Sequence, residues 1–535
     1  MKILEIIDEL EKNSQIKEIK NFERKTSEDI EISDITYNSK EAKKNSLFIC
    51  KGNAFKREYL LDSMKNGSVA YISEIDYSDY LTCEKMRDMG CEQPIITIVV
   101  KDVRLSMGIL ANLFFDRPWK EISLIAFGGT KGKSTATYML KKIIDDTKGK
   151  LSGVISSIEV FDGKNNVEAG LTTPEAMELQ RILRREVENK IDFCSMEVSS
   201  QALKYHRTYG MRFKVGIFLN MGYDHISPLE HENFDAQNTT TSQMKMFLTR
   251  LGFNSKMIMM TQCENLVINK DSDHIDEILK IAEKNISSEK IFTYSIKDED
   301  ADMYGKDIKY DVKQNKSIFT LVDNRDGKTY DEVSLNMIGD FNVSNAVSAI
   351  LAAKILGIKV EDAAKTLDNI LVKGRMNIVT AQNGNIVAIV DYAHNKMSFE
   401  NLFDMIKRIY EGYRIVAVFG CPGGKAFNRR KELAQVASEY ADRIILVPED
   451  SNYEDPDEIS NDILKYVNDE SKAEILHDRE FGIVKTLKES EENFIKTGEK
   501  TVIAITGKGW ETTMKVEGKN VPIKSDMKIV TENLY

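Results

Sequence analysis

The sequence predicts an α/β protein built from three domains. At 535 residues the chain is several times the size of an ordinary domain, which indicates about three or four folding units. Short apolar runs alternate with segments of helical periodicity along most of its length, as expected for sheets covered by helices. The 42% hydrophobic and 30% charged residues are typical of a globular chain with sizeable cores.

A small N-terminal α/β domain is predicted over residues 1–118. A helix is expected from Ile3 to Leu10, and buried strands are expected at 46–50, 69–73 and 94–100. Arg117-Pro118 marks the boundary, because the residue before a proline is biased out of the helical conformation.

The central domain, expected over 119–373, opens with a strand, a glycine-rich turn and a helix in succession. ISLIAF is followed by GGTKGK and by STATYMLKKII. The runs at 193–198 and 215–221 predict further buried parallel strands, whose carboxyl ends carry ligands in such sheets. Asp326-Gly327 within 317–337 predicts an antiparallel hairpin at the flank.

A C-terminal Rossmann-like domain is predicted over 374–535. Its apolar runs alternate with helical segments, which is typical of a mostly parallel sheet. The runs lie at 386–394, 415–421, 444–450 and 502–509.

The charge pattern and the cysteines exclude several classes of partner and site. The net charge is -11 with no basic stripe, so we expect neither a nucleic-acid partner nor membrane insertion. The six cysteines have no metal-binding spacing and are expected to be reduced. Because no signal-like start and no apolar run of about 18 residues is present, we expect a cytoplasmic protein, and we expect a monomer.

The segment GGTKGKS makes the central domain a predicted P-loop mononucleotide-binding domain. Backbone N–H groups and a helix N-terminus surround phosphate oxygens in such a loop, while a lysine neutralises their charge. The loop is one residue tighter than usual, because Phe127 stands where the first glycine is expected. Ser134 is a candidate magnesium ligand, and a turn without a ligand is the alternative. The candidate phosphate-binding residues are Gly128, Gly129, Thr130, Lys131, Gly132, Lys133, Ser134 and Thr135.

This tight loop resembles that of the Mur ligase family, whose members build the peptide stem of bacterial cell-wall precursors. Other segments resemble further signatures of the family in the same order and cover most of the chain. Within the family, TTP, MEVSS and Arg207 are most similar to the branch that adds the third residue of the peptide. The matching segments are LTTPE from Leu171, MEVSSQAL from Met196, NMGYDH from Asn220, GDFNVSN from Gly339, GRM from Gly374 and DYAH from Asp391.

The resemblance implies an ATP-dependent ligase that activates a carboxylate as an acyl phosphate and couples it to an amine, with release of ADP and phosphate. Such a transfer brings anions together, so Mg²⁺ and Lys133 are expected to offset their repulsion. Glu197 and His225, at the ends of adjacent predicted strands, suit the metal, although either residue could simply be solvated.

The resemblance also implies that Lys245 is carbamylated to N6-carboxylysine and completes the metal site. An insertion between Pro228 and Thr241 leaves the register open, with Lys256 as a second candidate and a plain surface lysine as the alternative.

Further residues receive implied binding roles. Asn342 and Asn345 are implied on the adenine side of ATP, while Arg375 and Asp391 reach ATP from the third domain; Asn342 could instead cap a helix. Because these groups must meet Lys133 from another domain, closure is expected on ligand binding. The UDP-N-acetylmuramoyl-L-Ala-D-Glu site is implied at Ser39, Thr172, Thr173, Ser199 and Arg207, whose planar fork suits a carboxylate.

The incoming diamino acid is implied at Arg430, Asp450, Asn452, Gly507 and Glu511. Diaminopimelate-adding relatives carry D-N-P-R where this chain reads EDSN and then YEDP, so the arginine for a distal carboxylate is missing. An acidic pocket without it favours lysine or ornithine. Asn38, Gln201 and Trp510 also depart from the family pattern, Trp510 standing in place of a histidine.

Two other functions remain open at this point. One is another carboxylate–amine ligase of the family, of the D-Ala-D-Ala-adding or polyglutamating type. The other is a catalytically inactive nucleotide-binding regulatory homologue, which the departures at 38, 201 and 510 would permit.

Overall fold

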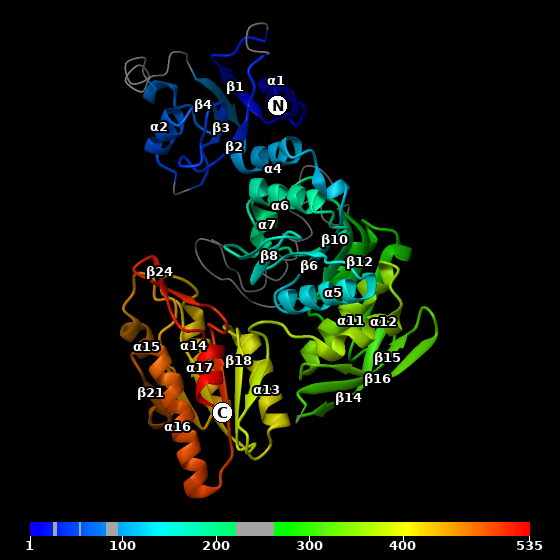
Figure 1. The fold of residues 1–535 in the computed structure, drawn as a ribbon, viewed down its shortest axis with the longest axis vertical. Coiled ribbons are helices and arrows are strands. Elements are labelled where there is room, and N and C mark those ends of the chain that lie inside the picture. Colours follow the sequence, from blue (N-terminus) through cyan, green and yellow to red (C-terminus); the bar gives the residue numbers. More distant parts are fainter. Residues whose placement is uncertain (25–28, 53–54, 82–94, 221–261, 313, 535) are drawn as a thin grey trace.

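The computed structural model describes residues 1–24, 29–52, 55–81, 95–220, 262–312 and 314–534. Three α/β bodies follow one another along the chain, with the N-terminal part at the top of Figure 1, the central part in the middle and the C-terminal part at the lower left. The predicted fold class is confirmed. Among these residues, no helix combines the length and the apolar character that crossing a membrane requires.

The N-terminal part is a five-stranded sheet in the order β1-β5-β4-β3-β2, with β1 antiparallel at its edge. Asp102 caps the helix after β5 by accepting hydrogen bonds from the backbone of Arg104 and Leu105. The elements are α1 (Ile3–Lys12), β1 (Ile16–Lys20), β2 (Asp34–Thr36), β3 (Ser46–Ile49), α2 (Arg57–Lys65), β4 (Ser68–Ser73), η1 (Ser78–Tyr80), β5 (Ile96–Val100), α4 (Val103–Phe114) and η2 (Pro118–Lys120).

The central part contains an eleven-stranded sheet in the order β16-β15-β14-β13-β12-β11-β6-β10-β7-β8-β9. Its strands are β6 (Ser123–Gly128), β7 (Gly153–Ile155), β8 (Glu159–Phe161), β9 (Asn166–Glu168), β10 (Phe193–Glu197), β11 (Phe213–Phe218), β12 (Cys263–Asn269), β13 (Ile291–Ser295), β14 (Met303–Asp311), β15 (Lys316–Asp323) and β16 (Lys328–Leu335). Its helices are α5 (Lys133–Lys148), α6 (Ala176–Glu188), α7 (Ser200–Lys204), α10 (Ile275–Glu283), η3 (Ser288–Lys290), α11 (Asp340–Ile355), α12 (Val360–Thr366) and η4 (Leu367–Asn369).

The two predicted parallel strands, β10 and β11, lie on either side of β6. All three strands are almost wholly buried, because helices cover both faces of the sheet. Their carboxyl ends therefore meet at one edge, where the glycine-rich loop leaves β6. The predicted hairpin is also confirmed, since β15 and β16 pair antiparallel.

The C-terminal part is a six-stranded sheet in the order β17-β18-β22-β19-β20-β21, parallel except for the edge strand β17. Its elements are β17 (Asn377–Thr380), β18 (Ile386–Asp391), α13 (Lys396–Ile409), β19 (Arg414–Phe419), α14 (Asn428–Tyr440), β20 (Arg443–Leu446), α15 (Pro456–Leu464), η5 (Glu470–Lys472), β21 (Ala473–Ile475), α16 (Arg479–Thr497), β22 (Thr501–Thr506), the hairpin β23 (Thr513–Val516) and β24 (Lys519–Pro522), and α17 (Asp526–Asn533).

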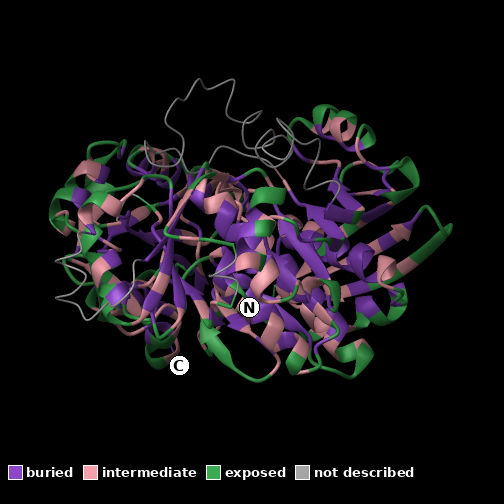
Figure 2. Cartoon of the chain, turned by 90° about the horizontal axis from the view of Figure 1, so that it is seen from above, coloured by how far each residue is buried: buried purple, intermediate pink, exposed green. Residues whose placement is uncertain are grey.

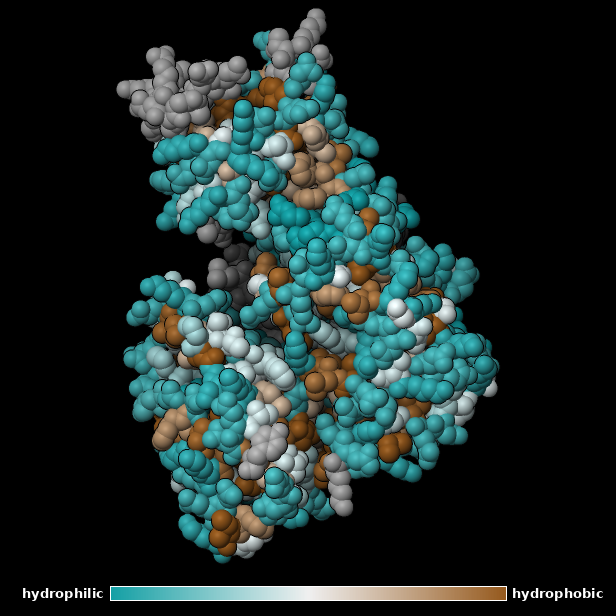
Figure 3. Space-filling view, viewed as in Figure 1, coloured by the Kyte–Doolittle hydropathy of each residue, from teal (hydrophilic) through white to brown (hydrophobic). Residues whose placement is uncertain are grey.

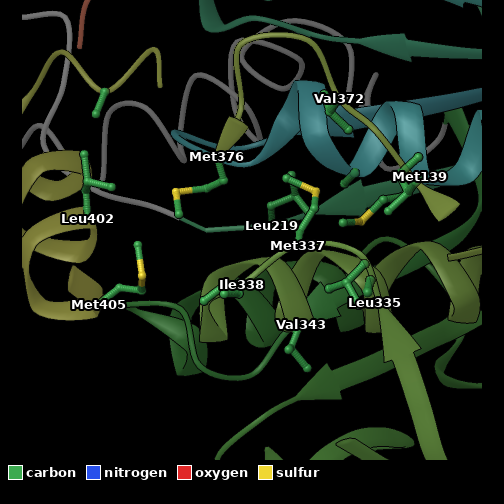
Figure 4. Packing of buried hydrophobic residues seen from close by; sticks show 14 of the residues in the cluster. Met139, Leu219, Leu335, Met337, Ile338, Val343, Val372, Met376, Leu402 and Met405 are labelled. Atoms are coloured by element: carbon green, nitrogen blue, oxygen red, sulfur yellow. The ribbon is translucent and has the colours of Figure 1, made fainter. Parts of the chain in front are cut away.

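One apolar cluster joins the central and C-terminal parts. Leu219 and Ile338 belong to the central part, and Met376 and Met405 belong to the C-terminal part, yet all four share this buried cluster. Figure 4 shows them around one region beside α5, α11 and α13. The outer surface is unlike this apolar cluster. Polar side chains cover most of the face shown in Figure 3, and apolar side chains form only small groups there. The central and C-terminal parts are therefore held in contact by buried apolar side chains.

Candidate active site

The glycine-rich loop connects β6 to α5 and needs glycine at two positions. Gly129 and Gly132 have φ values of 136° and 83°, in the region that L-residues avoid. At Gly132 an added Cβ would also lie 2.4 Å from Asn345 Oδ1. The glycine therefore lets α11, which carries Asn345, approach the loop closely.

Asn220, two residues after the end of β11, holds the loop in place. Its side chain accepts a hydrogen bond from Lys131 N at 2.8 Å and donates one to Lys131 O at 3.0 Å, while its own carbonyl accepts from Thr130 N at 3.1 Å. Lys133 Nζ donates to the carbonyls of Gly129 and Thr130 at 2.7 and 3.1 Å. The lysine ammonium thus lies over the loop itself, where phosphate oxygens bind in such loops.

Ser134 and Glu197 are linked through Ser157, a residue that the sequence did not single out. The Ser134 and Ser157 hydroxyls are 3.0 Å apart, and Ser157 N donates to Glu197 Oε1 at 2.8 Å. Glu197 ends β10 and is only 1% exposed. Hydroxyl and carboxylate oxygens are ligands that Mg²⁺ accepts, so this pair fits one side of a magnesium site.

The other predicted metal ligands, His225, Lys245 and the alternative Lys256, lie outside the described residues. Within the described part of the chain, no group of three or more His, Cys, Asp or Glu side chains could hold a metal ion. The full metal set therefore stays a prediction.

A cavity of about 880 Å³ lies between the loop and the C-terminal part. Arg375 spans it, because its guanidinium donates to Ser134 Oγ at 3.2 Å. Asp391 accepts from the backbone of Met376 at 2.8 Å and of Ala393 at 2.7 Å, and burial raises its pKa although Arg375 acts against the rise. The predicted ATP residues that line this cavity are Thr130 to Thr135, Asn342, Asn345, Arg375 and Asp391. Gly128, the last residue of β6, and Gly129 directly precede them.

Asn342 does not cap a helix, so that alternative is wrong. Helix α11 begins at Asp340 with Gly339 at the capping position, and Asn342 lies in its first turn. Its side-chain amide donates to Ile338 O at 2.8 Å. The amide is therefore held at the cavity wall.

Arg408 of α13 contacts the central part. It donates to Asp340 Oδ2 at 2.9 Å and to the Tyr310 hydroxyl at 3.0 Å, and Tyr310 also hydrogen-bonds Asp340. Asp340 and Arg408 both line the cavity, so this contact between the two parts lies at its wall.

The predicted dipeptide residues of the central part gather behind Glu197. Thr173 Oγ1 donates to Glu197 O at 2.9 Å and accepts from Ser199 N at 3.1 Å, while Arg207 donates to Thr173 O at 2.9 Å. Thr172 lines the cavity. Ser39 lies apart in the N-terminal sheet domain, where its carbonyl accepts from Asn66.

Cations from two domains surround Glu175, and of these the sequence singled out only Arg207. Arg207 and Lys51 each approach its carboxylate at 2.9 Å, and Arg104 lies 3.9 Å away. Burial acts to raise the pKa of Glu175, but Arg207 and Lys51 more than offset it, so that the pKa is lowered. Three cations around one carboxylate leave a positive surplus where the N-terminal and central parts meet.

In the C-terminal part, the structure brings Asp450, Gly507 and Glu511 together around Lys508. This lysine is 3% exposed and pairs with Asp450 at 2.9 Å and with Glu511. Glu449 lies alongside, where burial raises its pKa to about 7. A signal for Lys508 was present in the sequence, because it directly follows Gly507.

The remaining predicted amine residues are held by other groups. Asn452 donates to Gly423 O at 2.9 Å. Arg430 pairs with Glu454 and, at 3.2 Å, with Asp462. Its predicted contact with an amino acid stays a prediction.

Comparison with known proteins agrees with this geometry. The model of the Mur ligase middle domain matches residues 128–353, and that of the Mur ligase glutamate ligase domain matches 374–509. A UDP-N-acetylmuramyl-tripeptide synthetase of Ligilactobacillus salivarius is 34% identical, over 97% of this chain and 96% of the relative. A UDP-N-acetylmuramoyl-L-alanyl-D-glutamate--L-lysine ligase of Streptococcus pneumoniae is 31% identical, over 100% of this chain and 99% of the relative.

A solved UDP-N-acetylmuramoyl-L-alanyl-D-glutamate--2,6-diaminopimelate ligase has the same fold. Its TM-score is 0.59 at 22% identity, over 95% of both chains. With near full-length relatives above 30% identity, the chain belongs to the Mur ligase family of ATP-dependent peptide ligases, on its tripeptide-synthetase branch.

Proposed function

We propose that this protein uses ATP and Mg²⁺ to add L-lysine as the third residue to UDP-N-acetylmuramoyl-L-Ala-D-Glu. The observation that carries the choice of lysine is the cluster of three carboxyl groups, Glu449, Asp450 and Glu511, beside Lys508. The ammonium of a diamino acid suits these carboxyl groups. No arginine stands at residue 452 to bind a distal carboxylate, because the residue there is Asn452. The relatives named L-lysine ligases support the same choice.

The donor half of the reaction is assigned to the cavity between the central and C-terminal parts. The loop and Lys133 hold the ATP phosphates, and Arg375 meets them from the C-terminal part. Ser134 and Glu197, with His225 and a carbamylated Lys245, would hold Mg²⁺, which offsets phosphate charge when bound. In-line transfer of the γ-phosphoryl group to the terminal glutamate carboxylate gives an acyl phosphate and ADP.

We assign the acceptor half of the reaction to the remaining predicted residues. Thr172, Thr173, Ser199 and Arg207 hold the dipeptide, and Ser39 binds the uridine nucleotide. The lysine α-amine attacks the acyl carbon, and the tetrahedral intermediate expels phosphate. We assign uridine-nucleotide binding to 1–118, ATP binding to 119–373 and amine binding to 374–535.

The decisive experiment measures phosphate release with UDP-N-acetylmuramoyl-L-Ala-D-Glu and a panel of amines. Turnover should be fastest with lysine, with ornithine next and diaminopimelate far behind. Turnover with D-Ala-D-Ala or glutamate in place of a diamine would contradict the assignment, and so would no turnover with any amine.

Lys133→Ala should lower phosphate release at least about 100-fold, because one preorganised cation at the transferring group is lost. Lys142→Ala is the matched control, since Lys142 lies on the same helix and pairs with Asp146 at its surface. Equal activities in the two variants would refute the assignment of the loop.

A further inference from the structure

Trp510 stands where the family pattern has a histidine, and its indole ties the amine loop, residues 507–511, to the start of the C-terminal part. Its Nε1 donates to Asn377 Oδ1 at 2.6 Å, and its backbone N–H donates to the Tyr392 hydroxyl at 3.1 Å. Trp510 is therefore anchored by both its side chain and its backbone, although the residue is 36% exposed.

Asn377 is the centre of the turn that presents Arg375. Its Oδ1 also accepts from Gly374 N at 2.7 Å, and its Nδ2 donates to Val372 O at 3.1 Å and to Arg375 O at 3.4 Å. Asn377 is 5% exposed, so the indole is one of the few groups that can satisfy the hydrogen-bonding capacity of its side-chain amide. A change at Trp510 must alter the hydrogen bonding of this turn.

Tyr392 locks the same turn against the amine loop by packing. A Cβ at Gly374 would lie 2.0 Å from its ring, and one at Gly509 would lie 2.9 Å from it. The Arg375 guanidinium is 4.6 Å from the ring centre. With the ring wedged between Gly374 and Gly509, the turn and the loop cannot shift independently.

These contacts form one path from the acceptor end of the site to the donor end. Glu511 and Lys508 form an ion pair at the amine side, Trp510 lies between them and Asn377, and Arg375 reaches Ser134 at 3.2 Å. An ammonium that binds Glu511 would compete with Lys508 for this carboxylate, so amine binding would change how the amine loop is held.

We propose that Trp510 and Asn377 are positioning residues that couple occupancy of the amine site to the placement of Arg375 at the phosphate loop. The proposal rests on the proposed function for the place where the amine binds. Coupling of this kind is reciprocal, so a bound amine and bound ATP should raise each other's affinity by the same factor.

The main test compares Trp510→Phe, which keeps an aromatic ring and removes the indole donor, with Trp119→Phe. Trp119 is a matched control because the chain has two tryptophans and the Trp119 indole also donates to an asparagine Oδ1, that of Asn112, at 2.6 Å. The affinity for a non-hydrolysable ATP analogue is measured with and without saturating lysine. Lysine should enhance binding in the unaltered protein and in Trp119→Phe, and about fivefold less in Trp510→Phe, the worth of one neutral hydrogen bond.

Two further variants separate positioning from simple damage. Trp510→His keeps a ring N–H donor and should recover part of the coupling, whereas Asn377→Ala combined with Trp510→Phe should add little to the single change. Undiminished coupling in Trp510→Phe, or an equal loss in Trp119→Phe, would overturn the proposal.

A readout without any amine distinguishes this proposal from the function on which it rests. In Trp119→Phe protein Trp510 is the sole indole, so its emission should change when the ATP analogue alone binds, and change less when Arg375→Ala is added. If the emission of Trp510 does not change when the ATP analogue binds, the proposal is overturned. A retained response without lysine turnover would overturn the proposed function alone.

Discussion

Gly132 lies against Asn345 so closely that a Cβ at Gly132 would come within 2.4 Å of Asn345 Oδ1. The contact joins the phosphate loop to α11, which also carries Asn342. Since both residues line the cavity, the width of the site at this point is set by the absence of a side chain.

Gly132→Ala should therefore weaken ATP binding as well as stability. A left-handed φ of 83° costs an L-residue about 1–2 kcal/mol. The new Cβ would also clash with Asn345 and push α11 away from the loop. Gly149→Ala is the matched control at the other end of α5, because it has a φ of 63° but nothing within 4 Å of an added Cβ. Calorimetric titration with ATP should show a loss only for Gly132→Ala, and thermal unfolding should show a loss for both. Equal ATP affinities would contradict the close packing.

A second prediction concerns the buried carboxyl of Glu186 on α6. It lies against β7, where a Cβ at Gly153 would come 2.2 Å from its Oε1, and burial raises its pKa from 4.5 to about 8. Folding therefore favours the protonated form. Stability from this group is full below about pH 4.5 and is lost as the pH rises towards 8.

Glu186→Gln should flatten the dependence of the unfolding free energy on pH between these values and stabilise the protein at the upper end. A difference of one in pKa corresponds to about 1.4 kcal/mol, so the gain is on the order of a few kcal/mol. Glu188→Gln on the exposed side of the same helix should change neither quantity. Urea unfolding at pH 5, 6, 7 and 8 measures both, and parallel curves for Glu186→Gln and the unaltered protein would contradict the assignment.

The sequence predicted central strands of all three sheets and the glycine-rich turn that follows β6. The runs that became β6, β10 and β11 are apolar throughout because both faces of the sheet are covered, and the glycine-rich turn follows from the φ values that only glycine accepts freely. Contacts between distant segments could not be predicted in this way. Ser157 and Lys51 belong to no motif. The fold alone brings Ser157 beside Glu197 and Lys51 beside Glu175.

Arg408 gives a third prediction, on the closure between the central and C-terminal parts. Its ion pair with Asp340 is partly exposed, at 54% and 38%, so it contributes about 1 kcal/mol at most. Arg408→Gln should therefore weaken ATP binding up to about fivefold, and small-angle scattering should show a larger radius of gyration without nucleotide. Lys407→Gln, on the same helix, is the control. An unchanged radius in Arg408→Gln would mean that the apolar cluster alone holds the two parts together.

Asn452 gives the last prediction, on the choice of amine. It has a φ of 54° and lies two residues after Asp450, at the position where the lysine-or-diaminopimelate choice is expected to be made. An arginine here would place a planar cation beside Glu449 and Asp450, reducing the acidic surplus and offering a fork to a distal carboxylate. Asn452→Arg should raise the ratio of kcat/KM for diaminopimelate to that for lysine roughly tenfold, which corresponds to about 1.4 kcal/mol.

The control for Asn452→Arg adds the same charge one residue further on. Tyr453 is 86% exposed, so Tyr453→Arg places its cation in solvent, where it is screened. If the amine preference depends on a directed contact at residue 452, the control leaves the ratio near its original value. If both variants shift the ratio equally, the preference reflects net charge at the mouth of the site. An unchanged ratio in both would place the selecting groups elsewhere, and the ion pairs of Lys508 with Asp450 and Glu511 would be the next to substitute.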